Sequence, residues 1–250
     1  MKKLVVALFM LGLGGGISHA EGLASGWSGE GSLSAGVTTG NTDTSDVGLA
    51  VDLKKEAGVW TYGLQASADY GKIDGQETKN RIFAGLDADR QLNDRLFAFG
   101  RLSHERDEFT GFESRTFVGT GLGYQIYEGD KVNWAVRGGP GLKIDKVREI
   151  NTVDGTGAPV TIPSETVNSF GVIAASDYSY AFNENVSFTN TTSVLYAKES
   201  TQISNSAAIT ASLTSKLSAR MSFDVRHDTD PPVGFEATDT ATRVSLVYAF

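Results

Sequence analysis

The sequence predicts an all-β fold: a single closed antiparallel transmembrane β-barrel of twelve strands. Three observations lead to this prediction. Segments of roughly ten to fifteen residues alternate between apolar and small or polar side chains, as in strands that face lipid on one side and a lumen on the other. The connections between these segments alternate between short and long. Large aromatic residues gather at the ends of the segments.

The first twenty residues predict a cleaved signal peptide that precedes the barrel. A lysine pair follows the initiating methionine, residues 4–17 form an apolar core, and residues 18–20 read Ser-His-Ala, a small-x-small cleavage site. This core is short for a helix that must cross about 30 Å of hydrocarbon. No later apolar run is longer, so a membrane-spanning form must use strands. The barrel is therefore expected to comprise residues 21–250.

The chain has an acidic charge balance and no cysteine. Its formal net charge is −8, and loss of the two lysines of the signal peptide lowers it by two, to −10. This charge argues against nucleic-acid binding by phosphate neutralisation. The absence of cysteine excludes disulfides and thiolate metal sites. No cofactor is expected.

Twelve segments carry the period-two pattern. They lie near residues 27–37, 45–54, 59–70, 80–90, 95–106, 115–127, 132–145, 166–179, 185–198, 203–213, 217–226 and 243–250. The fifth is ambiguous because Phe97 and Phe99 lie on the same face as Arg101 and Glu105. Its register is therefore left open.

The connections provide an independent indication of the topology. Every second connection is short, near residues 56–58, 91–94, 128–130, 181–185 and 215–216. The other set includes the longer connections 71–78, 107–114, 148–165 and 227–238, with 39–44 and 199–202 as shorter exceptions. Barrels of this kind have short periplasmic turns and longer outside loops. Both ends of the mature chain are thus expected at the periplasmic rim.

Aromatic residues are expected to form a girdle at this rim, because amphipathic rings favour the membrane–water boundary. The girdle residues begin outward-running segments or end inward-running ones. They are Trp27, Trp60, Trp134, Tyr178, Tyr248 and Phe250.

Several stretches resemble a known family. The last eight residues alternate cleanly and stop at Phe250, which resembles the closing strand of an outer-membrane β-barrel. Residues 26–42, 107–124 and 239–250, with their Gly-Trp, Thr-Gly-Asn-Thr and alternating-glycine motifs, resemble the YdiY-like salt-induced outer membrane protein family, a family of unknown function. The resemblance implies integral location in the outer membrane and contact with its lipid and lipopolysaccharide. It also implies recognition of the terminal strand by the barrel-assembly machinery.

Charged residues on the inward faces are candidate lumen-lining residues. They are Arg101, Arg137, Lys143, Asp145, Arg220, Asp224 and Arg243. Their mixed signs allow two interpretations, a narrow pore for small solutes or ions, or ion pairs that plug a structural barrel concerned with envelope integrity. Twelve strands lie between the filled eight-stranded barrel and the open sixteen-stranded one, so both interpretations stay open.

The glycines at positions 119, 121 and 123 alternate within a strand, so they do not form a phosphate-binding loop, which needs a strand-to-helix turn. We expect them to leave room on the inner wall for long side chains such as Arg101 or Arg137.

An enzyme that modifies lipids on a barrel scaffold is the alternative function. Such an enzyme needs a serine, a histidine and a third polar group. His104 has Ser103 beside it, but adjacent strand residues point to opposite faces, and His227 lies near a loop. No catalytic or metal-binding residue is therefore assigned. Six basic residues near the outer rim are candidates for contact with anionic headgroups: Lys72, Lys79, Arg106, Lys146, Arg148 and Lys198.

Overall fold

A computed structural model describes residues 26–41, 43–153 and 157–250. The expected signal peptide lies outside the described residues. Across the described ranges, no helix is long and apolar enough to cross a membrane.

Fourteen strands account for nearly all of the described chain. They are β1 (Trp27–Thr39), β2 (Thr44–Ala57), β3 (Trp60–Ile73), β4 (Gln76–Gln91), β5 (Leu96–Asp107), β6 (Phe112–Glu128), β7 (Val132–Val147), β8 (Ile150–Val153), β9 (Pro159–Ile162), β10 (Glu165–Ala181), β11 (Val186–Ala197), β12 (Thr201–Ser212), β13 (Leu217–Asp228) and β14 (Thr238–Ala249). All except β8 and β9 form one closed barrel in the order β1-β14-β13-β12-β11-β10-β7-β6-β5-β4-β3-β2. The predicted closed antiparallel barrel of twelve strands is confirmed.

The barrel closes where the last strand returns to the first. β1 pairs with β14 from Glu30 opposite Ala249 to Thr39 opposite Thr240. Beyond this ladder, the Gly29 N–H donates to the Phe250 carbonyl at 3.1 Å and the Phe250 N–H donates to the Gly29 carbonyl at 3.0 Å. Closure leaves no strand edge unpaired, which a barrel in lipid requires.

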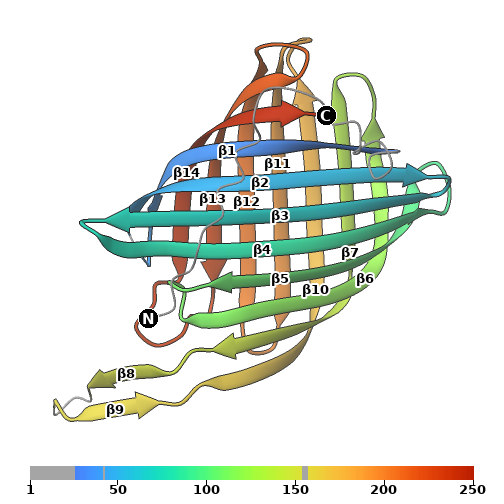
Figure 1. Cartoon of the computed structure of the whole chain (residues 1–250). Helices are drawn as coiled ribbons and strands as arrows, with labels where there is room; N and C mark the ends of the chain where they lie inside the picture. Colours follow the sequence, from blue (N-terminus) through green and yellow to red (C-terminus); the bar gives the residue numbers. More distant parts are fainter. Residues whose placement is uncertain (1–25, 42, 154–156) are drawn as a thin grey trace.

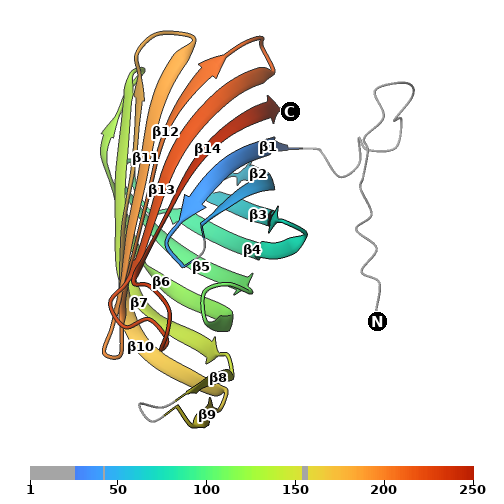
Figure 2. The ribbon, with the colours of Figure 1, turned by 90° about the vertical axis from the view of Figure 1, so that its left-hand side faces the viewer.

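The strands are strongly tilted, so opposite walls cross at a steep angle. Figure 1 shows β1 to β5 in front, running across β10 to β13 behind. Figure 2 shows the same two walls from the side, with β10 to β13 on the left. We call the end that holds the C-terminus and the turns after β2, β4, β6, β10 and β12 the short-turn end. The opposite end, where the β8–β9 hairpin projects, is the long-loop end.

Two expected loops differ from the structure. Residues 71–78 are not a long loop, because β3 and β4 continue to a two-residue turn at Asp74 and Gly75. Both residues have positive φ, 48° and 85°, as tight hairpin turns between twisted strands require. Residues 148–164 contain the antiparallel pair β8 and β9, whose register runs from Ile150 opposite Ile162 to Val153 opposite Pro159.

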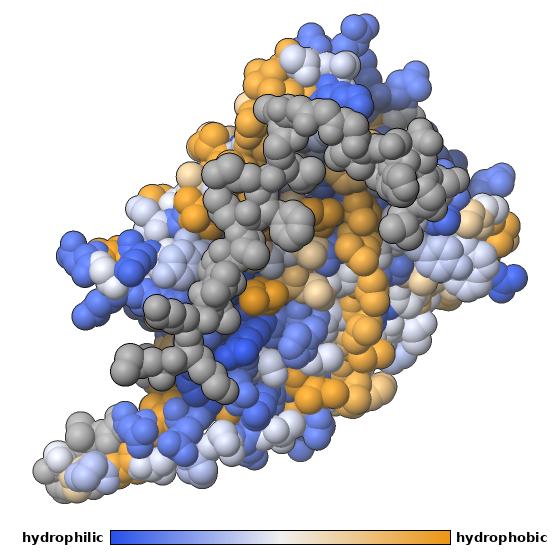
Figure 3. Space-filling view, viewed as in Figure 1, coloured by the Kyte–Doolittle hydropathy of each residue, from blue (hydrophilic) through white to orange (hydrophobic). Residues whose placement is uncertain are grey.

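The outer surface of the barrel is apolar around its middle. Leu49, Phe170 and Val244 are 60%, 73% and 60% exposed, on three different strands. On the face seen in Figure 3, apolar residues gather in a band that crosses the molecule from upper left to lower right, with hydrophilic residues toward both ends. An exposed apolar band is typical of a barrel surface in contact with hydrocarbon.

The register of β5, which the sequence left open, places its two phenylalanines inside. Phe97 and Phe99 are 7% and 2% exposed and form an apolar cluster with Phe117 of β6 and Ile173 of β10. Leu195 of β11 packs against this cluster. The inner wall is therefore apolar on one side of the lumen.

Two inward glycines of β6, Gly119 and Gly123, leave room for these aromatic rings. A Cβ atom added to Gly123 would overlap the Phe97 ring, and one added to Gly119 would lie 2.5 Å from Phe117 Cζ. The expectation that these glycines accommodate arginine is wrong in this respect, because aromatic rings occupy the space. The guanidinium carbon of Arg137 lies 5.6 Å from the centre of the Phe97 ring and 5.8 Å from that of Phe99.

Candidate functional site: the charged lumen

The seven charged residues proposed to line the lumen all lie on the inner wall and all take part in ion pairs. The pairs are Arg101–Asp87 at 3.8 Å, Arg137–Asp177 at 3.3 Å, Arg137–Asp89 at 3.6 Å, Lys143–Asp145 at 2.9 Å, Arg220–Glu30 at 2.6 Å and Arg243–Asp224 at 3.1 Å. The interior therefore holds compensated charge along its length.

Glu105 of β5 joins two opposite walls of the barrel. On its own side it accepts hydrogen bonds from Arg81 of β4, at 2.9 Å from Nε and 2.5 Å from Nη2. From across the lumen it is met by Arg226 of β13, whose Nη1 lies 3.1 Å from Oε2. β5 and β13 are six positions apart in the ring of twelve strands, which makes them diametrically opposite.

A second ion pair crosses the lumen nearby. Arg115 of β6 donates to Asp228 of β13 at 2.8 Å, although these strands are five positions apart in the barrel. The Arg115 guanidinium also lies over the Phe112 ring, 3.4 Å from its centre. Because these residues lie close to the strand ends, both crossings narrow the lumen at the long-loop end.

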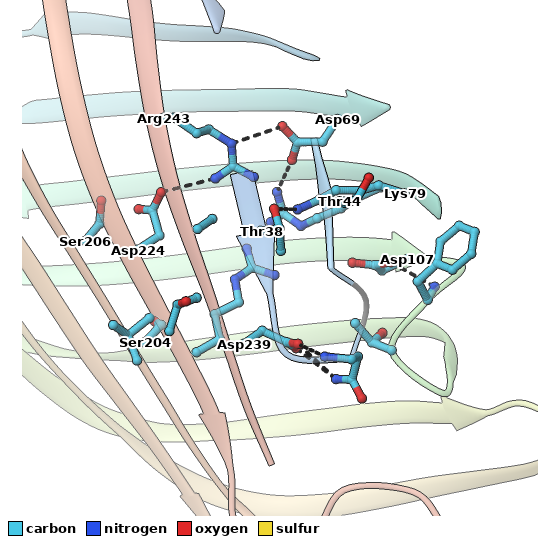
Figure 4. A pocket seen from close by; sticks show the side chains of 18 of the residues that line it. Thr38, Thr44, Asp69, Lys79, Asp107, Ser204, Ser206, Asp224, Asp239 and Arg243 are labelled. Carbon is cyan, nitrogen blue, oxygen red and sulfur yellow. Dashed lines mark hydrogen bonds and ion pairs between the residues drawn. The ribbon is translucent and has the colours of Figure 1, made fainter. Parts of the chain in front are cut away.

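Arg243 of β14 is the centre of the neighbouring group. Its Nη1 lies 3.1 Å from Asp224 Oδ2, and its Nε lies 3.4 Å from Asp46 Oδ2 and 3.9 Å from Asp69 Oδ1. Figure 4 shows the guanidinium group between Asp224 on one side and Asp69 on the other. The Asp46 side chain is fully buried and also accepts a hydrogen bond from Thr38 at 2.8 Å.

The short-turn end carries its own pairs. Arg220 of β13 binds both carboxylate oxygens of Glu30 of β1, at 2.6 and 2.9 Å, and donates from Nε to Thr210 at 3.0 Å. Two parallel bonds fix the geometry as well as the charge. Arg137 reaches Asp89 of β4, three strands away.

A cavity of about 300 Å³ lies between these charges in the long-loop half of the lumen. Four cations and four carboxylates contribute to its lining: Lys79, Arg81, Arg226, Arg243, Asp69, Asp107, Asp224 and Asp239. The wall formed by β11 and β12 adds hydroxyl groups from Thr191, Ser204 and Ser206. The charges that line the cavity thus balance.

The sequence interpretation misplaced or missed part of this network. Lys79 was expected at the outer rim, yet its Nζ donates to Thr38 at 2.8 Å inside the barrel and lies 3.8 Å from Asp46. Arg81 was not singled out. Its inward position can be inferred from its neighbour Ile82: an apolar residue in this alternating strand faces outward, so the adjacent Arg81 faces the lumen.

Two other basic residues of the outer-rim group do lie on the outer surface. Arg106 pairs with Glu108 at 3.4 Å and Lys146 pairs with Glu113 at 2.8 Å, with side chains 60% and 44% exposed. They remain candidates for contact with anionic headgroups.

The six girdle aromatics lie at the short-turn end, at or near the ends of β1, β3, β7, β10 and β14. Trp134 packs edge-on against Tyr178, with ring centres 6.4 Å apart. Basic side chains lie over three of the rings: Lys55 over Trp27 at 5.8 Å, Arg90 over Trp60 at 5.9 Å and Lys216 over Tyr248 at 5.9 Å. Such cation–π pairs suit a boundary at which one side is apolar and the other is wet.

Both histidines of the described chain bond to threonine. His104 Nδ1 lies 2.8 Å from Thr116 Oγ1, and His227 Nδ1 lies 2.8 Å from Thr238 Oγ1. Within residues 26–41, 43–153 and 157–250, neither ring is hydrogen-bonded to a serine or a carboxylate. The same residues contain no group of three or more His, Asp or Glu side chains placed to hold a metal ion.

Solved structures with the same fold are membrane barrels. The NanC porin matches 87% of this chain and 98% of its own, with a TM-score of 0.54 at 10% identity. The translocator domain of the autotransporter NalP from Neisseria meningitidis matches 90% of this chain and 88% of its own, with a TM-score of 0.55 at 12% identity. At these identities the likeness concerns the fold alone.

Sequence comparison identifies the family. The uncharacterized protein YdiY of Escherichia coli (strain K12) is 24% identical over 223 residues, which cover 88% of this chain and 82% of that protein. The family model described as "Protein of unknown function, DUF481" matches residues 31–250, from the middle of β1 to the last residue. This chain therefore belongs to the DUF481 family of proteins of unknown function.

Proposed function

We propose that this protein resides in the outer membrane and forms a narrow passive pore for ions or small polar solutes, held closed at its long-loop end by ion pairs across the lumen. The apolar band, the aromatic girdle and the porin-like fold support the location. The short-turn end then faces the periplasm, and the exposed basic residues of the long-loop end meet lipopolysaccharide.

The observation that carries the proposal is the link between Glu105 and Arg226. Its two residues come from diametrically opposite strands, so forming it narrows the lumen. The Arg226 side chain is 44% exposed, whereas Glu105 is 17% exposed and is also held by Arg81. A partly exposed ion pair stabilises the conformation that contains it by only about 0–1 kcal/mol. Such a link opens and closes readily, with Arg226 as the moving partner.

The adjacent cavity fits the same function. Its paired charges and hydroxyl groups can replace part of the hydration shell of an ion or a small polar solute. Because its cations and acids balance, the cavity itself favours neither charge strongly.

Single-channel recordings in planar bilayers test the proposal. The native barrel is expected to give small conductance steps with long closed times. Arg226→Gln removes the charge that crosses the lumen and leaves Glu105 paired with Arg81. Loss of a link of at most about 1 kcal/mol is expected to raise the open-to-closed ratio by up to about fivefold.

Arg106→Gln is the matched control, because Arg106 lies at the same end but on the outer surface. It is expected to leave both conductance and open probability unchanged. If folded, heat-modifiable native protein and Arg226→Gln both give no steps above background, the pore is refuted and the structural-barrel interpretation takes its place.

That second interpretation, a plugged barrel concerned with envelope integrity, is favoured by the extent of the pairing. Ion pairs occupy both halves of the lumen, and the Phe97 cluster covers one wall between them. The lipid-modifying enzyme has less support, because within the described residues the side-chain hydrogen bonds of His104 and His227 go to threonine hydroxyls. Assays for lipid deacylation on purified native barrel address that alternative directly.

A further inference from the structure

We propose that the solute of this pore is a small uncharged polyhydroxyl compound, such as a sugar alcohol, which moves along the inner face of β11 and β12. This inference rests on the proposed pore and specifies what passes through it. The inner face of these two strands, here called the hydroxyl wall, presents serine and threonine side chains to the lumen. They are Ser187, Thr189, Thr191, Ser193, Ser204 and Ser206.

The hydroxyl wall is the uncharged part of the lumen. Neither β11 nor β12 contains a charged residue, whereas each of the other ten barrel strands contains at least one. On the diametrically opposite strands β3 and β4, the side chains of Asp69 and Arg81 are mostly buried in their ion pair at 3.1 Å. On the hydroxyl wall, Thr189 and Thr191 point inward and are nevertheless exposed. Open lumen therefore borders the hydroxyl wall.

Two cavities meet at this wall. The first is the cavity of about 300 Å³ in the long-loop half, where Figure 4 shows Ser204 and Ser206 across from Lys79 and Asp107. The second, of about 280 Å³, lies toward the short-turn end. Its inward lining includes Gln125, Asn133, Asp177, Ser179 and Thr189. Among the described residues, Thr191 is the one that lines both cavities, so a solute that crosses from one to the other passes Thr191.

The second cavity offers neutral hydrogen-bonding groups. Within the part of the chain that the structure describes, the side chains of Asn133, Ser179 and Thr189 form no hydrogen bond with another protein group. The carboxylate of the lining, Asp177, is compensated, because its Oδ2 accepts from Arg137 at 3.3 Å and its Oδ1 accepts from Thr191 at 3.2 Å. Amide and hydroxyl side chains both donate and accept. The groups left for a solute are therefore uncharged donors and acceptors.

A polyhydroxyl solute matches these groups. Each of its hydroxyls donates one hydrogen bond and accepts up to two, as serine and threonine hydroxyls do, so it exchanges water for the wall without loss. An ion would exchange its hydration water for neutral hydroxyl groups that do not balance its charge. Both cavities lie at the lower end of the range of about 300–1,000 Å³ for ligand pockets, which suits one small molecule better than a chain.

Swelling of liposomes that contain the native barrel measures the entry of such solutes. Xylitol, an uncharged polyhydroxyl probe, is expected to enter faster than glycine betaine, a smaller zwitterion without hydroxyl groups. Size alone would give the reverse order. Equal or faster entry of glycine betaine, in a preparation that shows conductance steps in potassium chloride, would overturn the polyhydroxyl solute and leave the pore standing. Absence of both swelling and conductance steps would overturn both proposals.

Thr189→Val and Thr191→Val test the hydroxyl wall itself, because valine keeps the shape of threonine and removes the hydroxyl group. Loss of one neutral hydrogen bond is expected to lower the ratio of xylitol entry to glycine betaine entry by about two- to tenfold in each variant. The ratio does not depend on how much barrel is inserted.

Thr192→Val is the matched control, because Thr192 is the next residue of β11 and faces outward. It is expected to keep the native ratio, and heat modifiability shows that all three variants are folded. Ratios in Thr189→Val and Thr191→Val that equal the ratio in Thr192→Val would overturn the path along the hydroxyl wall.

Discussion

At the scale of single residues, three arginines in the lumen each meet more than one carboxylate. Arg81 contacts Asp69 and Glu105, Arg137 contacts Asp89 and Asp177, and Arg243 reaches three acids. A planar guanidinium with five donors suits such shared contacts better than a lysine does. The pairing compensates most of the acidic side chains that face the inside of the barrel.

Arg220 provides the residue-scale prediction, because its bidentate bond to Glu30 lies at the periplasmic end of the proposed conduit. Arg220→Glu would place three acids, including Asp52 opposite Glu30, in one part of the inner wall. Two units of charge change, each worth about 1 kcal/mol at 4 Å in water, are expected to raise the potassium-to-chloride permeability ratio on the order of tenfold. Reversal potentials in a potassium chloride gradient measure this ratio.

Arg90→Glu is the control for Arg220→Glu. Arg90 lies at the same end but on the outer surface, over the Trp60 ring, so its reversal should leave selectivity unchanged. An equal shift in both variants would mean that surface potential, and not a lumen contact, sets the selectivity.

Single residues also show where sequence interpretation reaches its limit. The lipid-facing residues must be apolar, so the alternation of β3 or β14 predicts outward faces directly. The inner wall can hold either apolar or charged residues, and Phe97 and Phe99 lie inside together with Arg101. The outer wall also has exceptions, because the amides of Asn190 and Asn205 lie outside. Both exceptions have local reasons: the two phenylalanines join an inner apolar cluster, and the two asparagines hydrogen-bond to each other and to Thr192.

At the scale of elements, the terminal strand determines closure. β14 pairs with β13 on one side and β1 on the other, and Phe250 extends the second ladder by exchanging two backbone hydrogen bonds with Gly29. The aromatic ring and the backbone of this residue therefore have separate roles. The ring belongs to the girdle, whereas the backbone completes the seam.

Two changes at Phe250 separate these roles. Deletion removes both hydrogen bonds to Gly29, each worth about 0.5–1.5 kcal/mol, and is expected to lower stability to urea in lipid vesicles by about 1–3 kcal/mol. Phe250→Ala keeps the backbone and should lower it less. If the assembly machinery also reads the terminal aromatic, both variants will reach the outer membrane of cells poorly. Normal insertion of the deletion variant in cells would contradict a role for this residue in assembly.

At the scale of the whole molecule, the strand count and closure followed from the sequence, but the contacts across the lumen did not. Glu105 and Arg226 are 121 residues apart, and nothing in either segment indicates that they meet. Their contact depends on β5 and β13 being opposite, which requires the full ring of twelve strands. The conformations of the loops were even harder to predict from the sequence. The β3–β4 turn is tight because Asp74 and Gly75 adopt positive φ, and the long connection after β7 contains the β8–β9 hairpin.

Because ion pairs close the proposed pore, its opening should depend on ionic strength beyond the effect on bulk conductivity. The Debye length falls from about 10 Å at 0.1 M salt to about 3 Å at 1 M, which weakens the partly exposed Glu105–Arg226 link more than the buried contacts of Asp46. The open probability of the native barrel is therefore expected to rise across a potassium chloride series. Arg226→Gln lacks the screened link and should show a flatter dependence. An open probability that is constant with salt in the native barrel, or that rises equally in both proteins, would show that another element closes the lumen.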